Sequence, residues 1–158
     1  MTYYTIYLEA KGVDLFSDFI ERCSKKHPDE LEQLKRWLER IGSEYGAEER
    51  YFRNEAFLGG DAKALPPPKG VSPIRKTKYI EDGNNLRLYC MVFNRHNVFL
   101  FNGATKTANK AQDCDNVYPH FLLANQLCRL IHTATVKKDI RIKDGQLEID
   151  DDFYLEIK

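Results

Sequence analysis

The 158-residue sequence has no long hydrophobic run, no net charge and no closely spaced cysteine pair. No stretch approaches the roughly 18 consecutive apolar residues that indicate a transmembrane helix. The first residues also lack the charged region and apolar core of a secretion signal. Membrane insertion and secretion are therefore not expected, and we expect a cytoplasmic protein.

The cysteines exclude two further classes of protein. Cys23, Cys90, Cys114 and Cys128 form no C-x-x-C pair, and their spacing to the four histidines matches no metal site. A disulfide scaffold and a structural zinc site are thus not expected, and we expect reduced thiols and no cofactor. Three of the cysteines, Cys23, Cys90 and Cys128, lie on apolar faces of the predicted elements.

The balance of charge gives no overall reason to expect a nucleic-acid partner. Lysine plus arginine and aspartate plus glutamate each number 24. The basic residues are nevertheless concentrated, because positions 75 to 110 contain seven of them and two acidic residues. The acidic residues that offset this local excess of positive charge lie largely after position 143. A cationic centre and an acidic tail are therefore expected in one domain covering residues 1–158, with a core over about 1–132 and an extension over about 137–158.

The N-terminal part predicts one strand and two helices. Residues 2–9 are rich in tyrosine and β-branched residues, which favours an edge strand. Asp14 can cap a helix that ends near His27, and Pro28 suits the first turn of a second helix that ends at Gly42 or Gly46. The apolar residues recur at helical spacing in both segments, so that the two helices should pack against each other.

The centre of the chain predicts a β-hairpin. Apolar and aromatic residues dominate 86–93 and 98–101, and the four polar residues between these segments can form the turn. Since both faces of this hairpin are bulky, we expect helices to cover each side in part. Asn102-Gly103 is expected to end the second strand. Upstream, residues 51–58 are read as a short strand, 64–73 as an extended connector and 74–80 as a charged strand or loop that, as a strand, would lie beside the hairpin.

The C-terminal part predicts a helix and a second hairpin. Asp115 or Asn116 can cap a helix that ends at His132, and Asp144-Gly145 is a strong turn signal between two short strands. Residues 153–157 are read as a last strand. Together these elements give an α+β fold, with an N-terminal strand and a two-helix hairpin packed on a central antiparallel sheet, a C-terminal helix and an added β-hairpin.

Several motifs of the central segment resemble a known family. They are L-R-L-Y at 86–89, V-x-L-F at 98–101 and G-x-x-K-T-x-x-K at 103–110, preceded by Arg53, Glu55 and A-L-P at 64–66. Over residues 48–132 this pattern is similar to the RelE/HigB-type toxin superfamily, in particular its phage-like HigB branch. The resemblance implies a RelE-like domain and a metal-independent endonuclease that cleaves mRNA, on the ribosome or free of it, and that a small antitoxin neutralises.

The same resemblance suggests which residues act. In such enzymes the ribose 2′-hydroxyl attacks the adjacent phosphate, which requires a base, an acid and cations for the developing charge. The implied catalytic residues are Lys76, Lys78, Arg87, Lys106, His96 and His120. The implied RNA-binding residues are Arg75, Arg95, Lys110, Arg53 and Tyr118.

Simpler interpretations of these residues stay open. The lysines could be ordinary surface residues, the histidines could cap helices or face solvent, and Arg53 and Glu55 could form structural ion pairs. Lys106 is also the one lysine before Thr107, where the family commonly has two. The alternative functions are a catalytically inactive RelE-like domain that binds RNA or protein, and an ordinary interaction domain.

Overall fold

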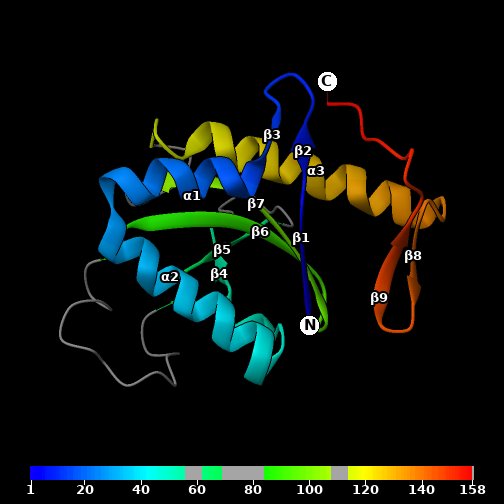
Figure 1. The fold of residues 1–158 in the computed structure, drawn as a ribbon, viewed down its shortest axis with the longest axis horizontal. Coiled ribbons are helices and arrows are strands. Elements are labelled where there is room, and N and C mark those ends of the chain that lie inside the picture. Colours follow the sequence, from blue (N-terminus) through cyan, green and yellow to red (C-terminus); the bar gives the residue numbers. More distant parts are fainter. Residues whose placement is uncertain (56–61, 69–83, 108–113, 158) are drawn as a thin grey trace.

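The computed structural model describes residues 1–55, 62–68, 84–107 and 114–157. These residues form an α+β fold around a five-stranded mixed sheet of order β1-β7-β6-β5-β4 (Figure 1). The helices are α1 (Leu15–Lys26), α2 (Pro28–Arg40) and α3 (Tyr118–Val136). The strands are β1 (Thr2–Thr5), β2 (Tyr7–Leu8), β3 (Val13–Asp14), β4 (Arg53–Asn54), β5 (Lys63–Leu65), β6 (Leu86–Asn94), β7 (Asn97–Thr105), β8 (Ile140–Lys143) and β9 (Gln146–Ile149).

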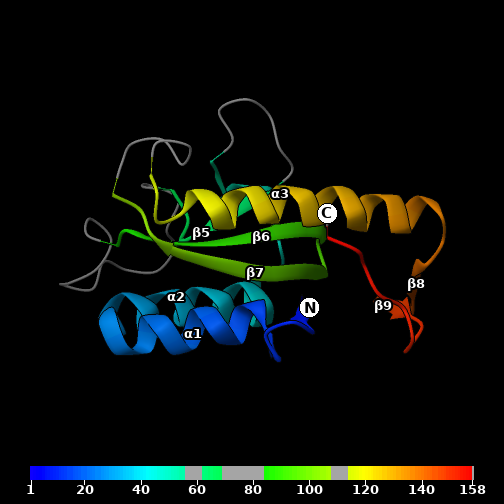
Figure 2. The ribbon, with the colours of Figure 1, turned by 90° about the horizontal axis from the view of Figure 1, so that it is seen from above.

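The central hairpin β6–β7 is sandwiched between two helical layers, as predicted. Helices α1 and α2 lie on one face of the sheet and α3 lies on the other (Figure 2). Alternation along β6 separates the two cores, because Leu88 and Cys90 pack with α1 and α2 whereas Tyr89 packs with α3. The predicted turn is tighter than expected, since the strands continue to Asn94 and Asn97.

The N-terminal predictions are confirmed in their main features. Asp14 caps α1, its Oδ1 accepting the backbone N–H of Ser17 at 2.8 Å, and Pro28 is the first residue of α2. The chain then continues through a π-helical turn over Ile41–Tyr45 and leaves it at Gly46, where a φ of 76° favours glycine.

Two predictions for the sheet are wrong. The sheet is mixed and not purely antiparallel, because β1 pairs with β7 in parallel, with Thr2 opposite Asn97. The proline-rich connector also contains a strand, β5, which joins β4 to β6. Its three residues precede Pro66, so the strand ends where proline removes a backbone donor. The strand predicted over 74–80 lies outside the described residues.

In the C-terminal part, both ends of α3 and the last predicted strand differ from the predictions. Helix α3 begins after Val117, with no side-chain cap from Asp115 or Asn116, and continues past His132 to Val136. Hairpin β8–β9 forms as predicted around Asp144-Gly145, both at positive φ. Residues 153–157 form no strand in the described chain. Asn97 and Tyr4 bind this hairpin at its turn and second strand, since Asn97 Nδ2 donates to the carbonyl of Gly145 and Tyr4 Oη accepts the N–H of Leu147, both at 3.0 Å.

Strand β7 crosses Asn102-Gly103 without breaking, contrary to the prediction. The register between β6 and β7 shifts between Leu88 and Cys90, where Phe101 and Asn102 of β7 form a bulge opposite the single residue Tyr89 of β6. A Cβ added at Gly103 would lie 1.8 Å from the carbonyl oxygen of Arg87. Glycine is therefore needed here for close backbone approach, and the strand reaches Thr105. No helix in the described ranges is long and apolar enough to cross a membrane.

Replacing Gly103 by alanine should disrupt the end of this hairpin. The new methyl group collides with backbone, so we expect the free energy of unfolding to fall by about 3 kcal/mol or more, measured by urea denaturation. Gly42→Ala is the matched control, because its Cβ would meet only the ring of Tyr3, at 3.2 Å. We expect that control to change stability by less than about 1 kcal/mol. Equal losses in the two variants would contradict the close approach.

Candidate functional site

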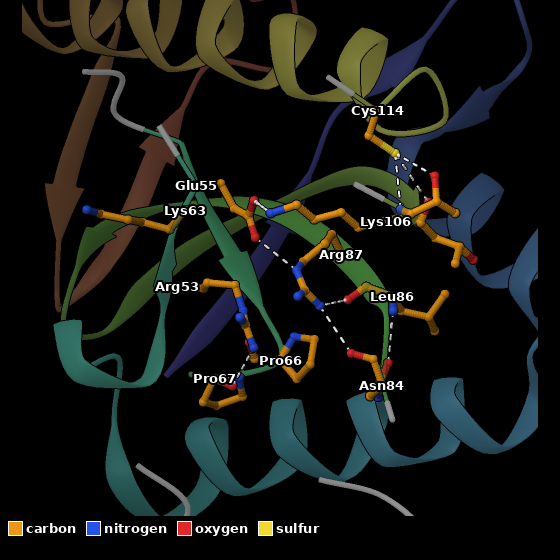
Figure 3. A network of polar contacts seen from close by, with 12 residues as sticks. Arg53, Glu55, Lys63, Pro66, Pro67, Asn84, Leu86, Arg87, Lys106 and Cys114 are labelled. Atoms are coloured by element: carbon orange, nitrogen blue, oxygen red, sulfur yellow. Dashed lines mark hydrogen bonds and ion pairs between the residues drawn. The ribbon is translucent and has the colours of Figure 1, made fainter. Parts of the chain in front are cut away.

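A buried carboxylate lies where β4, β6 and β7 come together (Figure 3). Glu55 follows β4, and its side chain is 2% exposed. One carboxylate oxygen, Oε1, accepts a hydrogen bond from Nε of Arg87 at 2.9 Å. The other, Oε2, accepts a hydrogen bond from Nζ of Lys106 at 2.5 Å. The side chains of Arg87 and Lys106 are only 10% and 12% exposed. Two of the predicted catalytic cations therefore share one carboxylate.

The position of Arg87 is fixed by more than this ion pair. Its Nη1 donates to the carbonyl oxygens of Leu86, at 2.8 Å, and Asn84, at 3.2 Å. Asn84 is itself buried: its Nδ2 donates to Oε1 of Gln33 at 2.7 Å, and its Oδ1 accepts the N–H of Leu86. Because Gln33 belongs to α2, the guanidinium is held to the helical layer as well as to the sheet.

Arg53 adds a third cation to this group. Its guanidinium donates to the carbonyl oxygens of Pro66, at 3.2 Å, and Pro67, at 3.1 Å. Burial lowers the pKa of Arg53, and the neighbouring charge of Arg87 lowers it further, while Glu55 opposes them. Three basic groups thus surround one carboxylate, which leaves an excess of two positive charges. We call Arg53, Glu55, Arg87 and Lys106 the Glu55 cluster.

Two further polar groups lie beside the Glu55 cluster. Tyr89 is fully buried, and its hydroxyl has no hydrogen-bond partner among the described residues. Burial raises the pKa of this phenol, and the negative charge of Glu55 raises it further. Burial also opposes ionisation of Cys114, but hydrogen bonds from the hydroxyl and N–H of Thr107 and from the start of α3 outweigh it and lower the pKa of Cys114 to about 7.

The cluster can hold an additional anion without losing Glu55. An ammonium group has three N–H donors and a guanidinium has five, so Lys106 and Arg87 can each bind Glu55 and a second acceptor. A phosphate oxygen is such an acceptor, and the excess positive charge favours it. Proton transfer is a separate requirement. Both oxygens of Glu55 bind cations and the phenol of Tyr89 is fully buried, so neither group is placed to transfer a proton to a substrate.

Other predicted site residues lie at the opposite end of the hairpin. Arg95 and His96 form the exposed turn between β6 and β7, and Nη2 of Arg95 binds Oε1 of Glu48 at 3.2 Å. Since β6 covers Leu86–Asn94, roughly 25 Å separate this turn from the Glu55 cluster. The prediction that His96 acts together with Arg87 and Lys106 is therefore wrong for this conformation.

The remaining predictions divide into two groups. Tyr118 and His120 lie in the first turn of α3, where Tyr118 is 37% exposed and His120 is half-buried. His120 lines a cavity on the α1 side of the end of β7 and not the Glu55 cluster. Arg75, Lys76, Lys78 and Lys110 lie outside the described residues.

Neither Tyr89 nor Cys114 was predicted as a site residue. Tyr89 belongs to the apolar pattern of β6 and Cys114 to a polar segment. Neither pattern shows that the phenol has no hydrogen-bond partner among the described residues or that Thr107 donates to the thiol. Structural ion pairs were the simpler interpretation of Glu55. Its carboxylate does form two, but with Arg87 and Lys106 and not with its neighbours in the sequence. In the part of the chain that is described, no three His, Cys, Asp or Glu side chains are arranged to hold a metal ion.

No protein-family model matches this sequence, and no curated protein or solved structure matches the chain.

Replacing Glu55 by glutamine should be strongly destabilising, because it leaves two buried cations without their shared carboxylate. We expect a loss of about 3–5 kcal/mol in the free energy of unfolding, measured by urea denaturation. Glu48→Gln is a matched control, since Glu48 also binds two arginines, Arg50 at 2.8 Å and Arg95 at 3.2 Å, on the surface. That control should cost less than about 1 kcal/mol. A similarly small loss for Glu55→Gln would show that the cluster does not support the fold.

Proposed function

We propose that this chain is a RelE/HigB-like toxin of a type II toxin–antitoxin system, a cytoplasmic endonuclease that cleaves mRNA without a metal ion. One observation carries the proposal: Arg87 and Lys106, which come from two of the motifs of the resemblance, bind the same carboxylate at 2.9 and 2.5 Å. Arg53 adds a third cation, and the whole group keeps an excess of positive charge. Such a group suits a scissile phosphate.

The roles of these residues follow from their contacts. Attack of the ribose 2′-hydroxyl on the adjacent phosphate builds negative charge on the phosphoryl oxygens, and Arg87 and Lys106 stabilise that charge. Glu55 is a positioning residue, because it holds the two cations side by side. An antitoxin that covers this end of the sheet would neutralise the enzyme.

A second candidate function is favoured by the burial of the same cations. The side chains of Arg87 and Lys106 are 10% and 12% exposed and are already partly neutralised by Glu55. Buried, partly neutralised cations are enough for a RelE-like domain that binds RNA or a protein partner without cutting. Such a domain would leave mRNA intact, whereas the toxin would cleave it.

Inducible expression followed by mapping of message 5′ ends separates the two functions. The wild-type chain should arrest growth and create new 5′ ends. Lys106→Gln, which keeps a hydrogen-bond donor for Glu55 but removes the charge, should reduce cleavage about 100-fold or more. Arg141→Gln is the control: Arg141 binds Glu148 at 3.1 Å in the C-terminal hairpin, and its removal should leave cleavage unchanged.

Each variant must remain folded for this comparison, which its urea midpoint shows. Intact messages and normal growth with a folded wild-type chain would exclude the endonuclease. Retention of RNA on a filter under those conditions would then select the binding domain, and absence of retention would leave an ordinary interaction domain.

A further inference from the structure

A second basic site lies on the other side of the end of β7. A cavity of about 430 Å³ opens there between the last turns of α1, the end of β7 and the start of α3. It is lined by Arg22, Cys23, Lys26, His27, Ala104, Thr105, Asn116 and His120. Thr105 and Lys106 are consecutive, so their side chains point to opposite sides of the chain, one toward this cavity and the other toward Glu55.

Arg22 is held in a fixed orientation at the wall of this cavity. Its Nε binds Oδ2 of Asp18 at 3.0 Å, and its Nη2 donates to the side chain of Asn102 and, at 2.8 Å, to the carbonyl of Gly103. The carboxylate of Asp18 also accepts Nδ2 of Asn102 at 2.7 Å. A guanidinium fixed in this way loses little entropy when it binds an anion.

Two imidazoles complete the wall from different elements. His27 lies at the junction of α1 and α2, and its Nε2 is 2.9 Å from Oγ1 of Thr105. His120 lies in the first turn of α3, where the helix dipole is positive. That turn, all of it in the described part of the chain, contains no acidic residue to offset the dipole. Lys26 adds a flexible ammonium from α1.

We propose that this cavity binds a phosphate group, either free phosphate or the phosphate of a nucleotide. Two permanent cations, two imidazoles and a helix N-terminus converge on it from three separate elements, and phosphate accepts hydrogen bonds from all of them. The volume exceeds what a single phosphate fills and lies in the range of small-molecule sites. This inference does not depend on the proposed RNA cleavage, because the Glu55 cluster is on the other side of β7.

Binding should depend on pH in a defined direction. Burial lowers the pKa of His120, the charges of Arg22 and Lys11 also lower it, and Asp18 opposes them. His120 is therefore mostly neutral at pH 7, and a bound phosphate favours its protonated form. Phosphate binding should therefore take up a proton at His120. Sulfate, whose charge does not change between pH 6 and 8, isolates this effect, and its affinity should fall as the pH rises over that range.

Nuclear magnetic resonance of the histidine rings tests this directly in the full-length chain. Added inorganic phosphate should shift the ring signals of His27 and His120 with one common saturation curve, and should leave those of the exposed His96 and His132 unchanged. Sodium chloride at equal ionic strength is the reference, because it screens charges without filling the site. Equal shifts in all four histidines, or none at His27 and His120, would overturn the proposal.

A pair of neighbouring lysines provides the matched variants. Lys26→Gln removes a cation that lines the cavity and should weaken phosphate binding about 3- to 10-fold. Lys25→Gln removes the same charge one residue earlier, where Lys25 binds Glu21 at 3.5 Å on the surface, and should weaken it less than about twofold. Both side chains are exposed, so neither variant should impair folding. Equal effects would mean that only the overall charge matters and would overturn the site.

The same titration with adenosine 3′-monophosphate distinguishes the two sources of phosphate. Tighter binding than that of inorganic phosphate supports a nucleotide in the cavity, whereas equal binding supports free phosphate. A failure of this site is distinguishable from a failure of the endonuclease. If phosphate does not bind but mRNA is cleaved, only the proposed phosphate site is rejected. If phosphate binds but mRNA stays intact, only the proposed endonuclease is rejected.

Discussion

Burial of the Glu55 carboxylate is the constraint on which this end of the molecule depends. A carboxylate that is 2% exposed must be compensated by partners at hydrogen-bond distance, and here the partners come from two different strands. Arg87 begins β6 and Lys106 follows β7, so that one side chain fixes the ends of both strands relative to β4. Any other arrangement of these strand ends would leave a buried charge unpaired, which costs free energy, so the observed arrangement is favoured.

Much of the architecture follows from local patterns in the sequence. The capping by Asp14, the helix start at Pro28 and the alternation around Tyr89 each depend on residues a few positions apart, which is why these predictions are confirmed. The mixed sheet could not be predicted in the same way. Pairing of Thr2 with Asn97 leaves no local signal, and the three residues of β5 are too few to show a period.

The site was predictable in part for the same reason. Arg87 and Lys106 were found through motifs, and the structure brings them together. Their common partner Glu55 and the buried phenol of Tyr89 are matters of tertiary distance, which the sequence does not encode locally. Arg22 was assigned no role and His27 was placed only at a helix end, because no local pattern shows that Thr105 and His120 lie beside them.

The parallel pairing of β1 with β7 has a consequence for biosynthesis. Thr2 pairs with Asn97, so β1 must wait after its synthesis for residues made almost a hundred positions later. During that interval the α1–α2 hairpin can form from local contacts, but its apolar face has no sheet to cover. Nascent chains stalled before β7 should therefore expose that face to chaperones, and chains extended past Thr105 should not.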